Sequence, residues 1–177
     1  MNKKKNISTK NMVQSGFLVA ISIVLTRVLV LMPTNTLRLS LGEVPLMVSG
    51  FLFGPVIGGI SGMAADLIGI AINPQGPPHF GFTLSSMLWG IIPGIFTMVF
   101  KKRNKENPYS NLSITFVVTI CILLISLGLN TYWLSQLYGK GFFVMLPARG
   151  LSALINIPLQ SIIIINLMKY LKNISKE

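Results

Sequence analysis

Basic residues gather in three places along this chain, and long apolar runs separate them. The first ten residues carry four lysines, a second cluster occupies 101–105, and the last nine residues carry three more lysines. Basic segments of membrane proteins lie on the cytoplasmic side. All three clusters meet this rule only if the chain crosses the membrane an even number of times between them. This requirement constrains the fold more than any other feature of the sequence.

The composition is typical of a membrane protein. Of the 177 residues, 51% are hydrophobic and only 11% are charged, with a mean hydropathy of +0.68. A soluble domain carries about a quarter charged residues. The net charge of +11 would suggest nucleic acid in a soluble protein. Here the lysines follow the topology rule, so we expect the lipid bilayer and no nucleic acid as partner, and a single domain over 1–177.

The apolar runs predict six transmembrane helices. A single crossing over 43–72 would put the 101–105 cluster on the wrong side, so we expect two short helices there. Glycine and proline residues predict a tight turn between them, near 54–59. We therefore expect an all-α membrane protein with both termini in the cytoplasm. The predicted helices cover approximately 12–32, 43–54, 57–72, 83–100, 110–129 and 147–169.

Three segments on the outer side, 33–42, 73–82 and 130–150, carry unusual polar and aromatic residues. The aromatic residues of the last two segments exceed what an interfacial belt needs, and they predict stacking on a planar ring. They are Phe80, Phe82, Tyr132, Trp133, Tyr138, Phe142 and Phe143. Asn130 and His79 are interleaved with them. His79 is the only histidine, so we expect no metal site.

Two charged residues lie well inside predicted helices, away from the helix ends. Asp66 lies about 10 Å inside the end of its helix, and a carboxylate at this depth is a functional candidate by default. A structural ion pair or a helix cap is the alternative. Arg27 lies at a similar depth on the first helix, about 9 Å below Pro33. It can pair with Asp66, face a ligand, or extend outward to water.

The outer segments are basic, which runs against the topology rule and calls for another reason. Arg38, Lys140 and Arg149 carry this charge. An anionic ligand is one reason, because arginine suits a bidentate carboxylate contact. Glu43 is either a second carboxylate at the site or only an acidic residue at the start of a helix.

Motifs of enzymes are missing from the sequence. It has no paired-carboxylate metal motif, no Ser/His/Asp set and no glycine-rich phosphate loop. Without a Walker motif the chain is not expected to hydrolyse ATP. We therefore expect a binding or transport subunit without a cofactor of its own.

Three segments resemble the S components of energy-coupling factor (ECF) vitamin transporters, and most closely the folate-specific S component. They are LRLSLGEVPLMVSGFLFGPVIGGISGMAADLIG at 37–69, GFTLSSMLWGIIPGI at 81–95 and LNTYWLSQLYGKGFFVMLPARG at 129–150. The resemblance implies an ECF S-component fold and a high-affinity folate-binding subunit in a bacterial plasma membrane. It also implies docking on a transmembrane T subunit with two ATPase subunits, which hydrolyse ATP to carry folate inward.

The resemblance also bears on particular residues. The family's small-residue face toward the T subunit maps to Gly16 and Ala20, with glycine in place of the first alanine. A pterin would offer a flat ring to the aromatic residues and a donor edge to Asp66 or Glu43, and its glutamyl tail would meet the basic residues. The candidate substrate-binding residues are Arg27, Arg38, Glu43, Asp66, His79, Phe80, Phe82, Asn130, Trp133, Tyr138, Lys140 and Arg149.

Two alternatives stay open at this point. One keeps the family and changes the vitamin to riboflavin or thiamin, although cationic thiamin would favour more acidic outer segments. The other is a small membrane enzyme or a structural subunit, because architecture alone does not fix function. A ligand that protects the folded chain would exclude the structural subunit.

Overall fold

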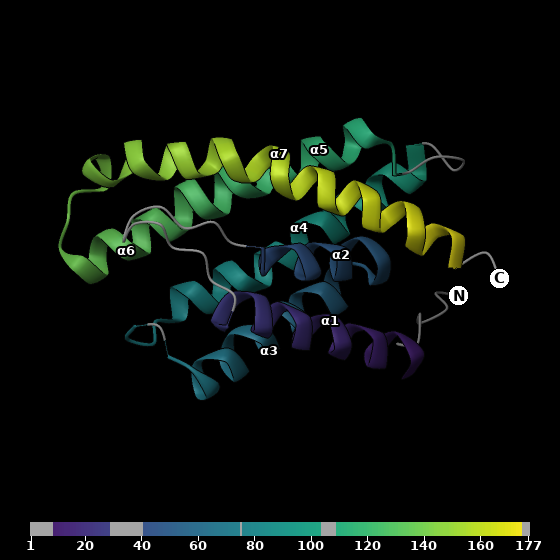
Figure 1. Ribbon diagram of the computed structural model, residues 1–177, viewed down its shortest axis with the longest axis horizontal. Helices are drawn as coiled ribbons and strands as arrows, with labels where there is room; N and C mark the ends of the chain where they lie inside the picture. Colours follow the sequence, from purple (N-terminus) through teal and green to yellow (C-terminus); the bar gives the residue numbers. More distant parts are fainter. Residues whose placement is uncertain (1–8, 29–40, 75, 104–108, 175–177) are drawn as a thin grey trace, which may run out of the picture.

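The computed structural model describes residues 9–28, 41–74, 76–103 and 109–174, and these residues are almost entirely helical (Figure 1). The expected all-α class is confirmed. In chain order the elements are α1 (Thr9–Arg27), α2 (Glu43–Phe53), α3 (Pro55–Ile72), α4 (Phe80–Arg103), α5 (Asn111–Cys121), the π-helix η1 (Ile122–Leu129), α6 (Asn130–Tyr138) and α7 (Phe142–Ile174).

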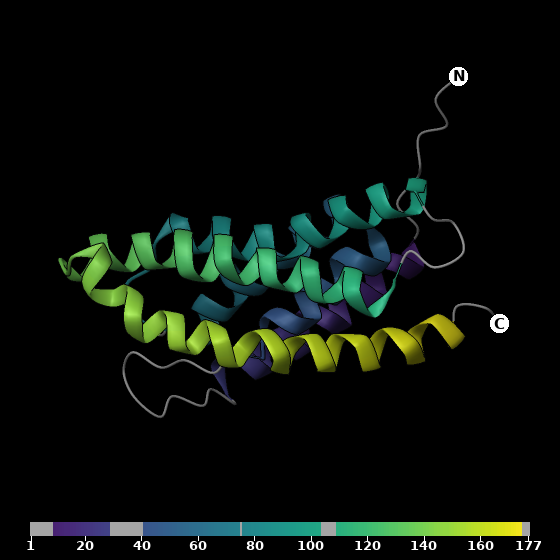
Figure 2. The same ribbon diagram turned by 90° about the horizontal axis from the view of Figure 1, so that it is seen from above.

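The helices run lengthwise through an elongated bundle whose two ends differ in character (Figures 1 and 2). The start of α1, the end of α4, the start of α5 and the end of α7 share one end. We call it the basic end, because Lys10, Lys101, Lys102 and Lys169 lie on these helix termini. The end of α3, the start of α4 and α6 lie at the opposite end. We call it the aromatic end, because it carries Phe82 and Trp133.

Four helices of the described chain are long and apolar enough to cross a membrane. They are Pro55–Ile72, Phe80–Lys102, Asn111–Tyr138 and Phe142–Leu171. The helix α2 is apolar too, but its 11 residues span only about 16 Å, against the roughly 30 Å of a bilayer core. Every residue of α2 from Val44 to Phe51 is buried. Since α1, α3, α4 and α7 pack around it, protein rather than lipid shields this short helix.

The turn between α2 and α3 is tighter than the range 54–59 that the sequence predicted. Gly54 alone makes it, with φ of 90°, a conformation that favours glycine, and Pro55 opens α3. The next glycines are helical and bring α3 against α4. A Cβ on Gly58 would lie 2.6 Å from the carbonyl oxygen of Gly90. Small residues at this contact let the two backbones touch, as is common in membrane bundles.

The segment 130–150 consists of α6, a short turn and the start of α7. The rod of α5, η1 and α6 is continuous to Tyr138, and Gly139 ends it in the left-handed region at φ 63°. The helix α7 then begins at Phe142, five residues before the predicted start at 147. Helical backbone at this depth satisfies its own hydrogen bonds, which a loop in lipid would not.

Candidate binding site at the aromatic end

An aromatic cluster joins the start of α4 to α6. The ring centre of His79 lies 5.4 Å from that of Trp133 and 5.9 Å from that of Phe82. These spacings are typical of packed aromatic pairs. The structure therefore brings together three of the aromatic and imidazole side chains that the sequence marked as candidates.

Glycine at position 81 makes this contact possible. The indole of Trp133 lies directly on the backbone there, and a Cβ on Gly81 would collide with it. The amide of Gly81 donates a hydrogen bond to Nδ1 of His79 at 3.0 Å. This bond fixes the imidazole as an acceptor at Nδ1 and orients its ring beside Trp133.

A polar network ties α1, α3 and α4 together directly beside the cluster. Arg27 and Asp66 form an ion pair at 3.6 Å, with only 12% and 9% of their side chains exposed. Thr83 donates a 2.7 Å hydrogen bond to the other carboxylate oxygen of Asp66. Arg27 and Asn73 each donate a side-chain hydrogen bond to the backbone carbonyl of the other. Both oxygens of Asp66 thus have protein partners.

Glu43 is in a different situation. Ser22 donates a 2.7 Å hydrogen bond to the carbonyl of Gly42, which fixes the start of α2 beside the end of α1. One carboxylate oxygen of Glu43, Oε2, is buried there and has no hydrogen-bond partner among the described residues. An unsatisfied buried acceptor costs free energy, so a donor that reaches it gains a strong contact.

Among the other buried polar atoms without a hydrogen-bond partner in the described residues, three lie on α6 or near the start of α4. They are Nε1 of Trp133, Oδ1 of Asn130 and Oγ of Ser85, which is only 2% exposed. Trp133 and Asn130 lie on α6, and Ser85 lies in the second turn of α4. Asn130 and Trp133 thus offer an acceptor and a donor on the helix that carries the indole of the aromatic cluster, and Ser85 and Glu43 offer polar atoms on α4 and α2.

Arg149 is held against the π-helix. It donates a 3.2 Å hydrogen bond to the carbonyl of Ser126, which also accepts a bond from the hydroxyl of Thr131. The wider π-helical turn ends at Leu129, directly before Asn130. Such turns are rare and occur often at functional sites, where they re-aim side chains. Arg149 therefore supports the turn that places Asn130 and Trp133.

The remaining candidates are exposed or lie outside the described chain. Phe80 is 93% exposed, and Tyr138 is more than half exposed. Lys140 is exposed in the turn between Gly139 and Gly141. Arg38 lies outside the residues that the structure describes.

Sequence reasoning missed two groups of buried polar residues. Ser85 is the first, and its small side chain gave no signal in an apolar helix. The second is a stripe on α7 formed by Ser152, Asn156 and Gln160, all buried. Their four-residue spacing puts them on one helix face, and this periodicity within an apolar run is a signal that the sequence does contain.

A small-residue surface lies on α1, away from the cluster. Gly16 and Ala20 are exposed, and a Cβ on Gly16 would meet nothing within 4 Å. Phe17 and Val13 are exposed beside them. The face is therefore apolar, open and free of bulk at its centre, which suits close approach of another helix.

Comparison with known proteins finds relatives that match most of this chain. Residues 10–168 match the family described as ECF transporter, substrate-specific component. The folate transporter FolT of Clostridium novyi (strain NT) is 33% identical over 162 residues, which is 92% of this chain and 87% of that protein. The folate transporter FolT of Leuconostoc mesenteroides subsp. mesenteroides is 26% identical over 159 residues, 87% of this chain and 82% of that protein.

Two solved structures have the same fold. A crystal structure of FolT bound with folic acid superposes with a TM-score of 0.78 at 28% identity, covering 93% of this chain and 97% of that one. The S component of a bacterial ECF transporter gives a TM-score of 0.70 at 23% identity, covering 95% and 98%. The second likeness is one of fold alone.

Proposed function

The chain belongs to the family of ECF transporter substrate-specific components, and on that premise we propose that it binds folate at the aromatic end. It is a multi-pass membrane protein and a transport subunit rather than an enzyme. Its relatives are named folate transporters, and a solved relative holds folic acid. The family resemblance that the sequence suggested is confirmed.

The observation that carries the proposal is the aromatic cluster, in which the buried N–H of Trp133 has no hydrogen-bond partner among the described residues. Folate joins a flat pterin with amino and ring N–H donors to a tail with two carboxylates. The rings of His79, Phe82 and Trp133 suit stacking on the pterin. Riboflavin and thiamin have flat rings as well, but no dicarboxylate tail to meet a basic region.

Glu43 is the better of the two candidate carboxylates for the pterin's donor edge. Both oxygens of Asp66 have protein partners, whereas Oε2 of Glu43 has none among the described residues. Asn130 adds a second acceptor, and Trp133 and Ser85 add donors. In this assignment Asp66 and Arg27 hold the helices that frame the site, and Glu43 contacts the ligand.

The glutamyl tail has basic residues to meet at the same end. We assign this part to Arg149 and Lys140, with Arg149 nearest to the framework of the site because it packs on η1, and from the sequence alone also to Arg38, which lies outside the described residues. Charge-assisted hydrogen bonds from arginine to carboxylate are among the stronger polar contacts in proteins.

The proposal extends to topology and partners. We infer six membrane crossings, with the basic end in the cytoplasm and the aromatic end outside, because Lys10, Lys101, Lys102 and Lys169 then all obey the positive-inside rule. Folate captured outside would be carried inward by a complex with a T subunit and two ATPases. The open face around Gly16 and Ala20 suits the contact with the T subunit.

The two tryptophans of the chain allow a direct test of the site. Replacing Trp133 with phenylalanine should weaken folate binding about tenfold or more, because it removes a donor and part of a stacking surface. Isothermal titration calorimetry on the detergent-purified chain measures this. The control is Trp89→Phe, which changes a buried core residue of α4 and should leave the affinity near that of the wild type.

Each outcome bears on a different part of the proposal. No heat of binding with the wild-type chain would contradict folate as the ligand. Folate binding that Trp133→Phe leaves unchanged would keep the function and remove the aromatic cluster from the site.

A further inference from the structure

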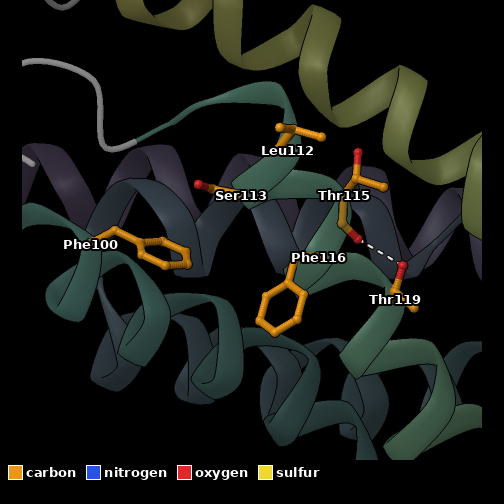
Figure 3. Close-up of a pocket in the computed structure, with 6 residues that line it drawn as sticks. All are labelled: Phe100, Leu112, Ser113, Thr115, Phe116 and Thr119. Carbon is orange, nitrogen blue, oxygen red and sulfur yellow. Dashed lines mark hydrogen bonds between the residues drawn. The ribbon is translucent and has the colours of Figure 1, made fainter. Parts of the chain in front are cut away.

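A hollow lies near the basic end of the bundle, between the end of α4 and the start of α5 (Figure 3). Its volume is about 520 Å³, and aromatic, aliphatic and hydroxyl side chains line it: Phe100, Leu112, Ser113, Thr115, Phe116 and Thr119. The cluster of His79, Phe82 and Trp133 is at the other end of α4. The hollow is therefore separate from the proposed folate site.

The lining offers apolar surface rather than polar contacts. Thr119 donates its hydroxyl to the carbonyl of Thr115, and Thr115 donates to Asn111, so both hydroxyls are used within α5 (Figure 3). Leu112 is 82% exposed, and the ring of Phe116 is also open to the surroundings. The hydroxyl of Ser113 is the remaining side-chain polar group of the lining, which is little to orient a polar ligand such as folate, whereas a hydrocarbon chain would find a fitting surface.

Positive charge borders this apolar surface. Lys101 and Lys102 directly follow Phe100 and are exposed. The ammonium of Lys101 lies 5.7 Å from the ring centre of Tyr109, so it leans from α4 toward the start of α5. The two described lysines thus bring positive charge to the basic-end side of the hollow.

We propose that this hollow binds an anionic phospholipid. One acyl chain would lie against Phe100, Leu112 and Phe116, and the phosphate would lie near Lys101 and Lys102. The order of the two surfaces matches a lipid in a bilayer, with hydrocarbon toward the membrane interior and the headgroup at the interface. Basic residues beside a helix end attract anionic headgroups in this way.

Native mass spectrometry of the full chain in a neutral detergent tests the proposal. The probes are phosphatidylglycerol and phosphatidylcholine with identical acyl chains, supplied in equal amounts. The wild type should retain phosphatidylglycerol at least threefold more than phosphatidylcholine. The double variant Lys101→Gln/Lys102→Gln should lose this preference. The matched control Lys10→Gln/Lys169→Gln removes two exposed charges at the same end and should keep it.

A second variant tests the apolar half. Ser113→Trp fills the hollow and should reduce retention of both lipids at least threefold, without changing the charge. The thermal shift that folate causes serves as the check that each variant is folded, since the folate site is at the other end.

Several results would overturn the proposal. Equal retention of the two lipids by the wild type would do so, as would equal loss in both double variants. Unchanged lipid retention by the folded Ser113→Trp variant would show that the lipid contacts lie elsewhere on the protein. A stable dimer that Ser113→Trp abolishes would make the hollow a contact between two copies of this chain.

Discussion

At the scale of single residues, Glu43 and Asp66 are the two acidic side chains in the described part of the chain, and their surroundings differ. Asp66 pairs with Arg27 and accepts a hydrogen bond from Thr83. Oε2 of Glu43 is buried, and no described residue donates to it. Burial penalises an unpaired carboxylate oxygen far more than a paired one. Loss of the charge should therefore lower the stability of the ligand-free protein at Asp66 but not at Glu43.

Glu43→Gln should weaken folate binding by about tenfold to a hundredfold, because hydrogen bonds to a charged group contribute about 1.5–3 kcal/mol. It should change the unfolding temperature of the free protein little, since the native carboxylate lacks a described partner. Calorimetric titration with folate measures the first quantity. Unchanged affinity would remove Glu43 from the site.

Asp66→Asn should instead destabilise the free protein by about 1–3 kcal/mol, because it removes the charge that Arg27 faces. Thermal unfolding of the ligand-free chain measures this effect. The same variant should change folate affinity less than Glu43→Gln does. The reverse pattern, with stability intact and affinity lost, would show that Asp66 contacts the pterin and that Glu43 is only a helix-start residue.

The sequence could predict the pair of Arg27 and Asp66 only as one of three alternatives for Arg27. Helical rise put both at similar depth, which made a contact possible. The contact itself depends on how α1 and α3 are rotated, and Thr83 reaches Asp66 because glycines bring α3 against α4. Hydrophobic pattern alone does not fix such a rotation between apolar helices.

At the scale of elements, the hairpin of α2 and α3 could be predicted from charge distribution. Counting crossings between basic clusters required two helices over 43–72, although the stretch is short for two. The helical state of 130–138 was harder to predict, because polar residues interrupt the apolar pattern there. Neither the composition nor the hydrophobic period of the sequence predicts the π-helix that precedes this segment.

The contact between α3 and α4 gives a prediction at this scale. Gly58→Ala should destabilise the protein by about 1–3 kcal/mol, since the added methyl group would meet the carbonyl of Gly90 at 2.6 Å. Gly150→Ala is the control, because open space surrounds that position on α7, and alanine there should be neutral or slightly stabilising. Equal unfolding temperatures for the two variants would contradict close packing of α3 on α4.

At the scale of the whole molecule, the two proposed interactions use different surfaces. The proposed folate site centres on the aromatic cluster of α4 and α6, and the small-residue face lies on α1. The sequence predicted both regions, the first from outer aromatic residues and the second from family resemblance. A substitution on one surface should therefore leave the other function intact.

Gly16→Leu should leave folate binding by the isolated chain unchanged and block folate uptake by the full complex. The leucine enters open space, so it does not disturb the fold, but it adds bulk where another helix would approach. Uptake of radiolabelled folate by proteoliposomes with the T and ATPase subunits measures transport. Gly150→Leu, which adds the same side chain on α7, should transport normally. Normal transport by Gly16→Leu would place the docking face elsewhere.

Thermal unfolding of the purified chain with folate, riboflavin or thiamin tests the central proposal most directly. A ligand that binds only the folded state raises the apparent stability by mass action, by about 2.7 kcal/mol at a hundred times its dissociation constant. Folate should clearly raise the unfolding temperature, and the other two vitamins should not. A rise with riboflavin or thiamin and none with folate would contradict the proposal.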